Sequence, residues 1–74
     1  MLSLDARLGA IIRQAREERG WSQERLGYRA KVHRNQIGNI ERGRSSASVR
    51  ILDRIARALD AQASDLLAAA DRGR

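Results

Sequence analysis

The chain has 74 residues, a formal net charge of +6 from 15 basic and 9 acidic residues, and no cysteine. Its length allows one small domain with a thin stability margin, and the lack of cysteine together with a single histidine excludes disulfides and any thiolate or multi-histidine metal site. All but one of the basic residues are arginines, which favour phosphate and guanine contacts, so a polyanionic partner is expected.

The sequence predicts a single domain over residues 1–74 that holds neither a cofactor nor a metal ion. The longest apolar stretches are much shorter than the ~20 residues that cross a bilayer, so no membrane contact is expected. The N-terminal segment is amphipathic like a transit peptide, but it contains Asp5 and continues directly into the periodic pattern of the domain. We therefore expect a cytoplasmic, nucleoid-associated protein.

The first two helices are predicted over residues 4–19 and 23–29. Gly20 ends the first helix, and Ser22 is a good N-cap for the second. The first helix carries one apolar stripe at helical spacing, made up of Leu4, Leu8, Ile11, Ile12 and Ala15.

A third helix is predicted over residues 34–42, after a tight turn formed by residues 30–32. His33 takes the N-cap position, and Ile37 and Ile40 share one face of the helix. The second and third helices therefore form a bihelical unit with an apolar inner side and a polar, basic outer side. Such a unit suits insertion into the major groove of DNA.

Two more helices are predicted over residues 48–59 and 63–70, with Ser48 as the N-cap of the first. No segment alternates with period two, so no sheet is expected. The expected fold class is all-α, with five short helices around one core. Residues 71–74 are expected to form a frayed tail.

The outer face of the third helix carries residue types that recognise bases. With the two isoleucines pointing inward, Asn35, Asn39 and Arg42 lie on the opposite side. Asparagine is a poor helix former and an unusual choice for a merely solvated face, but it reads adenine, and arginine reads guanine. This face is therefore predicted to contact DNA, against the alternative that it is only solvated.

Three further residues have roles suggested by their positions. Gln23 lies at the N-terminus of the second helix, where backbone N–H groups attract a phosphate, unless it is an ordinary first-turn residue. Arg16 lies beside the apolar stripe of the first helix and Glu41 lies near the inner side of the third. A pair between Arg16 and Glu41 is predicted to tie the recognition helix to the scaffold.

From Leu4 to Ala69 the chain resembles the phage repressor/Cro (Xre) family of helix-turn-helix regulators. The resemblance is carried by the strings Trp-Ser-Gln-Glu-Arg-Leu at residues 21–26, Ile-Glu-Arg-Gly at 40–43 and Leu-Asp-Arg-Ile-Ala-Arg-Ala-Leu at 52–59. The string Val-His-Arg-Asn at 32–35, followed by Ile-Glu-Arg-Gly, is also similar to controller proteins of restriction–modification systems, although small repressors and antitoxins share it.

The resemblance implies a repressor-like DNA-binding domain whose second and third helices form the helix-turn-helix. It implies a base-reading set made up of Arg34, Asn35, Asn39 and, at its edge, His33. It also implies a phosphate-binding set made up of Ser22, Gln23, Arg42 and Arg44. The pair of Arg16 and Glu41 is similar to one that the family uses structurally.

The chain departs from the family pattern at three places. Lys31 replaces the usual glycine of the turn, where a left-handed lysine would cost ~1–2 kcal/mol. The loop after Gly43 lacks the common Asn-Pro, which leaves the entry into the fourth helix less fixed. Gln62 replaces the usual serine cap, which suggests a soft C-terminal helix.

The leading hypothesis is a sequence-specific regulator that binds double-stranded DNA as a homodimer on a palindromic site, because one helix reads only a few base pairs. A possible seam between subunits, or alternatively part of the core, is formed by Val49, Ile51, Leu66 and Leu67. An antitoxin that also binds a toxin is the alternative, and a protein-interaction module or an enzyme is disfavoured. Contact with RNA polymerase is left open.

Overall fold

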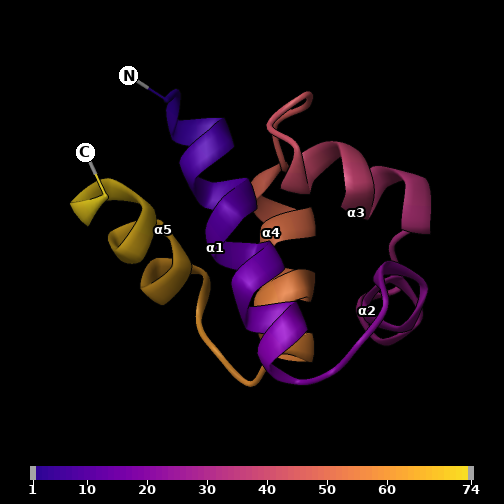
Figure 1. Cartoon of the computed structure of the whole chain (residues 1–74). Coiled ribbons are helices and arrows are strands. Elements are labelled where there is room, and N and C mark those ends of the chain that lie inside the picture. Colours follow the sequence, from indigo (N-terminus) through magenta and orange to yellow (C-terminus); the bar gives the residue numbers. More distant parts are fainter. Residues whose placement is uncertain (1, 74) are drawn as a thin grey trace.

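The computed structural model describes residues 2–73, and within this range the chain forms five α-helices and no strand (Figure 1). This confirms the all-α, five-helix fold class. The helices are α1 Leu4–Glu18, α2 Gln23–Ala30, α3 Arg34–Glu41, α4 Val49–Ala58 and α5 Ala63–Arg72.

The helix-turn-helix pair α2 and α3 lies on one side of the molecule, and α5 lies on the other (Figure 1). Helix α1 packs against α3 and α5, while α4 packs against α2 and α5. The two chain ends lie near each other, beside the N-terminal part of α1. All five helices contribute side chains to one core, whose largest fully buried side chains are Ile12, Leu26, Ile37, Ile40, Ile55 and Leu59.

Helix α5 is longer and better capped than the sequence suggests. It ends at Arg72 rather than at residue 70, so the expected frayed tail is wrong for Asp71 and Arg72, and Arg74 lies outside the described residues. The carboxylate of Asp65 accepts a hydrogen bond from the backbone N–H of Gln62 at 3.1 Å. Asp65 thus supplies the half of a capping box that does not depend on a serine at position 62.

Helices α1 and α3 cross with almost no space between their backbones. A Cβ atom added at Gly9 of α1 would lie 2.2 Å from the carbonyl oxygen of Ile40 and 2.6 Å from that of Glu41. Any larger side chain would therefore force α3 away from α1, because both obstacles are backbone atoms. Gly9 therefore determines how closely α3 packs against α1.

The turn between α2 and α3 contains the strained residue that the sequence predicts. Lys31 has φ 58° and ψ 44°, which is the left-handed region, and its backbone N–H closes the last turn of α2. A β-carbon in this region crowds the following carbonyl oxygen, which glycine avoids.

We expect Lys31→Gly to stabilise the fold by about 0.5–1 kcal/mol, because relief of strain in the turn exceeds the entropy that glycine adds to the unfolded chain. Urea unfolding followed by circular dichroism measures the change. The contrasting variant is Arg29→Gly in the last turn of α2, which should destabilise by about 1 kcal/mol or more, because it adds a helical glycine and removes the contact of Arg29 with the ring of Trp21. Loss of stability in Lys31→Gly would show that the lysine is not strained.

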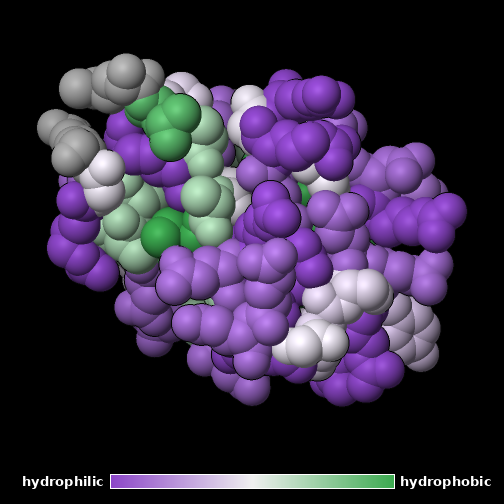
Figure 2. Space-filling model, viewed as in Figure 1, coloured by the Kyte–Doolittle hydropathy of each residue, from purple (hydrophilic) through white to green (hydrophobic). Residues whose placement is uncertain are grey.

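The surface is hydrophilic over most of the face shown in Figure 2, with one apolar patch beside the two chain ends. A shallow hollow at this end lies between α1 and α5, and its lining is Leu2, Arg7, Ala10, Ile11, Ala69, Ala70 and Gly73. Among the residues that the structure describes, no helix has the length and apolar character needed to cross a membrane.

Candidate nucleic-acid interface

Helix α3 presents one face to the core and the opposite face to solvent, as its sequence pattern predicts. Ile37 and Ile40 are fully buried. On the outer side Arg34 and Asn35 are exposed, and Asn39 is half-buried. Three members of the base-reading set therefore lie on one accessible surface of a helix that the core holds in place.

His33, the fourth member of that set, acts as the N-cap of α3. Its Nδ1 accepts a hydrogen bond from the backbone N–H of Asn35 at 3.0 Å, and the side chain is exposed. An Nδ1 that accepts a hydrogen bond leaves Nε2 as the atom that can face a ligand. His33 thus lies exposed at the N-terminal end of α3.

Asn39 and Arg42 contact each other on the outer face. Nη2 of Arg42 donates a hydrogen bond to Oδ1 of Asn39 at 3.1 Å. A carbonyl oxygen has two lone pairs, so Oδ1 can still accept a second hydrogen bond, while both amide N–H donors remain available. This arrangement leaves Asn39 able to pair with N6 and N7 of adenine.

Two members of the phosphate-binding set, Gln23 and Arg42, have side chains close to Gly38, where α2 begins and α3 ends. The hydroxyl of Ser22 caps α2 by accepting from the backbone N–H of Arg25 at 3.0 Å. A Cβ atom added at Gly38 would lie 3.1 Å from a guanidinium nitrogen of Arg42 and 3.3 Å from the side-chain oxygen of Gln23. Gly38 therefore makes room for both side chains, a role that the sequence pattern does not reveal.

Arg44, the remaining member, lies in the loop after α3, three residues beyond its last residue, Glu41. Its side chain is exposed, and its backbone N–H donates to the carbonyl oxygen of Asn39 at 2.9 Å. This bond fixes the start of the loop that leads to α4. The backbone of Arg44 is thereby held against the C-terminal part of α3.

A buried ion pair fixes α3 to α1. Arg16 and Glu41 form two hydrogen bonds, Nε to Oε2 at 2.7 Å and Nη2 to Oε1 at 3.0 Å. Arg16 also donates to the carbonyl oxygen of Trp21 at 2.7 Å, and Gln23 donates to Oε1 of Glu41 at 3.0 Å. The hydrogen bonds to Glu41 raise the pKa of Arg16 above its ordinary value, despite the opposite effect of burial. One carboxylate thus connects α1, the start of α2 and the end of α3.

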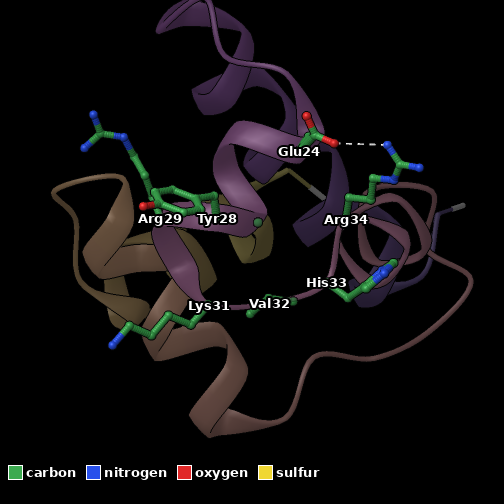
Figure 3. Close-up of a pocket in the computed structure, with 8 residues that line it drawn as sticks. Glu24, Tyr28, Arg29, Lys31, Val32, His33 and Arg34 are labelled. Carbon is green, nitrogen blue, oxygen red and sulfur yellow. Dashed lines mark hydrogen bonds and ion pairs between the residues drawn. The ribbon is translucent and has the colours of Figure 1, made fainter.

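A second, exposed ion pair links α2 to the first residue of α3. Nη1 of Arg34 donates to Oε2 of Glu24 at 3.1 Å (Figure 3). The two residues are at the rim of an open hollow lined by the outer side of α2 and the turn, where Tyr28, Lys31 and His33 also lie. Sequence reasoning missed Glu24, because no helical spacing relates residues on two different helices.

The four residues predicted as a possible seam between subunits do not share one environment. Val49 is 84% exposed, and Leu67 is 39% exposed. Ile51 is half-buried and packs against the core. Leu66 is only 6% exposed, because α5 turns this side chain toward the other helices, so of the two alternatives the structure places Leu66 in the core. Within residues 2–73 no group of three or more histidine or acidic side chains could hold a metal ion.

Comparisons with known proteins agree on one family. Residues 12–66 match the helix-turn-helix family. Control protein C.BamHI of Bacillus amyloliquefaciens is 38% identical over 60 residues, which cover 80% of this chain and 74% of that protein.

Two solved structures are also similar to this chain. The clp gene regulator ClgR from Corynebacterium glutamicum superposes with a TM-score of 0.90 at 29% identity, covering 97% of this chain and 77% of that chain. The restriction-modification controller protein C.AhdI from Aeromonas hydrophila has a TM-score of 0.81 at 31% identity, covering 84% of this chain and 94% of that chain. The chain described here belongs to the helix-turn-helix family of DNA-binding transcription regulators, of the phage repressor/Cro (Xre) type.

Proposed function

We propose that the chain regulates transcription by binding a palindromic site on double-stranded DNA as a homodimer, in the cytoplasm. The observation that carries this proposal is the outer face of α3, where Arg34, Asn35 and Asn39 stand accessible while Ile37 and Ile40 hold the helix in the core. These side chains have the donors and acceptors that distinguish adenine and guanine in the major groove. The likeness to C.BamHI and C.AhdI supports a controller of a restriction–modification system.

The phosphate-binding set supports the same proposal. The side chains of Gln23 and Arg42 both lie beside Gly38, close to the N-terminus of α2, where the helix dipole favours an anion. Such contacts fix the register of a protein on DNA, while the base-reading set supplies sequence preference.

Binding to duplex DNA is expected to weaken steeply as salt is added, because each phosphate contact releases condensed counterions. If a dimer makes about 8 phosphate contacts, the slope of log K against log salt should be about −7. Fluorescence anisotropy with a labelled duplex at four salt concentrations measures this slope. An affinity that stays constant over a fourfold range of salt would contradict the proposed function.

A homodimer is proposed because one α3 helix reads too few base pairs for a useful specificity. We expect Leu67→Asp to give a folded protein that remains monomeric at tens of micromolar and binds the operator weakly, as measured by sedimentation and anisotropy. Leu67 is exposed on α5, so an aspartate there can be solvated in the monomer.

Ala68→Asp is the matched control, since Ala68 is the next exposed position on α5. It should leave the dimer intact if the seam depends on Leu67. If Leu67→Asp leaves the dimer intact but Leu2→Asp dissociates it, the subunits instead contact each other through the apolar hollow between α1 and α5.

A further inference from the structure

The geometry points to Glu24 as a specificity-determining residue that holds Arg34 away from phosphates on non-cognate DNA, while the donors that the ion pair leaves free reach a guanine on the cognate site. This inference rests on the proposed function, because it concerns how the base-reading set is controlled. Glu24 itself reads no base. It acts on Arg34 through the ion pair that joins α2 to the first residue of α3.

The pair is placed and oriented for this role. Both side chains are well exposed, 62% for Arg34 and 73% for Glu24, so the pair stands on the accessible surface rather than in the core. The single hydrogen bond of 3.1 Å uses Nη1 of Arg34. In Figure 3 the other guanidinium nitrogens point away from Glu24. A guanidinium has five N–H donors, so donors remain for O6 and N7 of a guanine.

A carboxylate at this position would otherwise oppose binding. Glu24 lies in the first turn of α2, next to the helix end where Ser22 and Gln23 are proposed to hold a phosphate. There its charge repels the DNA backbone. A role in helix stability alone would not require a partner on α3, because an acidic residue interacts with the dipole of its own helix.

The strengths of the three contacts open to Arg34 indicate that the ion pair can favour a guanine contact over a phosphate contact. An exposed ion pair is worth up to about fivefold in an equilibrium constant. A bidentate guanine contact is worth about 5- to 150-fold. The contribution of one phosphate contact is reduced by salt, about threefold when the salt concentration rises fourfold. Glu24 can therefore compete with a phosphate for Arg34, whereas a guanine contact made through the free donors does not have to break the ion pair.

The test compares Glu24→Gln with the wild type on a selected operator and on a random duplex, over a range of salt. The variant should bind the random duplex at least about threefold more tightly, with a salt slope steeper by about 0.9 per subunit, because Arg34 gains a phosphate contact. Affinity for the operator should change less than affinity for the random duplex. The ratio of operator affinity to random-duplex affinity should therefore be lower in the variant than in the wild type.

Glu17→Gln is the matched charge control. Glu17 also forms an exposed ion pair with an arginine, Arg13, at 3.2 Å, but both residues lie on α1. Any effect of net charge alone appears equally in this variant. Circular dichroism shows whether each variant is folded.

Arg34→Ala provides the decisive background. In a protein that already carries Arg34→Ala, Glu24→Gln should change the salt slope on random DNA no more than Glu17→Gln does. A change that persists without Arg34, or that is equal on both DNAs, would overturn the inference while leaving the proposed function intact. A wild type with no preference for any duplex sequence would instead overturn the proposed function, and the inference with it.

Discussion

Glu41→Ala is expected to destabilise the fold by about 3–5 kcal/mol, since it leaves the guanidinium of Arg16 buried without its carboxylate partner. The same substitution removes the acceptor of the Gln23 side chain. Small domains are stable by only about 5–15 kcal/mol, so a chain of this size should lose most of its margin. Urea unfolding followed by circular dichroism measures the loss.

Two controls separate the buried charge from other effects. Glu17→Ala removes an exposed acid of the same type and should cost less than about 0.5 kcal/mol. The double variant Arg16→Met with Glu41→Leu should be more stable than Glu41→Ala alone, because no unpaired charge is left in the interior. A loss below about 1 kcal/mol in Glu41→Ala would contradict the role assigned to the pair.

Asn39→Ala is expected to weaken binding to the cognate operator by about 1–3 kcal/mol and to affect random DNA much less, because the lost hydrogen bonds are made to a base edge. Arg44→Ala should weaken binding to both DNAs alike, since a phosphate contact carries no sequence information. Anisotropy titrations with an operator duplex and a random duplex measure all four affinities.

The partner of Asn39 supplies a further control. Arg42 donates to Asn39 in the free protein, so Arg42→Ala tests whether Asn39 needs this support. If Arg42 only binds a phosphate, its loss should be similar on both DNAs. Equal losses for Asn39→Ala on operator and random DNA would reject base reading by this residue.

The features that could be predicted from the sequence depend on contacts within one helix. The apolar spacing of Ile37 and Ile40 fixes which side of α3 faces the core, and Ser22 and Ser48 cap the helices that follow them. The left-handed turn at Lys31 was predictable from the usual glycine of the family. These signals are local, so the positions of neighbouring helices do not alter them.

The features that could not be predicted depend on how the helices cross. Gly9 matters only because the backbone of α3 lies against it, and the pairing of Glu24 with Arg34 requires the angle that the turn imposes. Leu66 and Leu67 are adjacent and chemically identical. Only the rotation of α5 about its axis decides that the first is buried and the second is partly exposed. Periodicity over a ten-residue helix does not fix that rotation closely enough.

The most direct test of base reading by α3 is selection of bound sequences from a random pool of duplex DNA, with stoichiometry measured on the selected site. We expect a palindromic motif whose half-sites lie about one helical turn apart, bound by two chains. The selection repeated with Asn39→Ala should lose base preference at one position in each half-site and keep it elsewhere. A pool that stays random, or a motif that is unchanged in the variant, would contradict the assignment of α3 as the recognition helix.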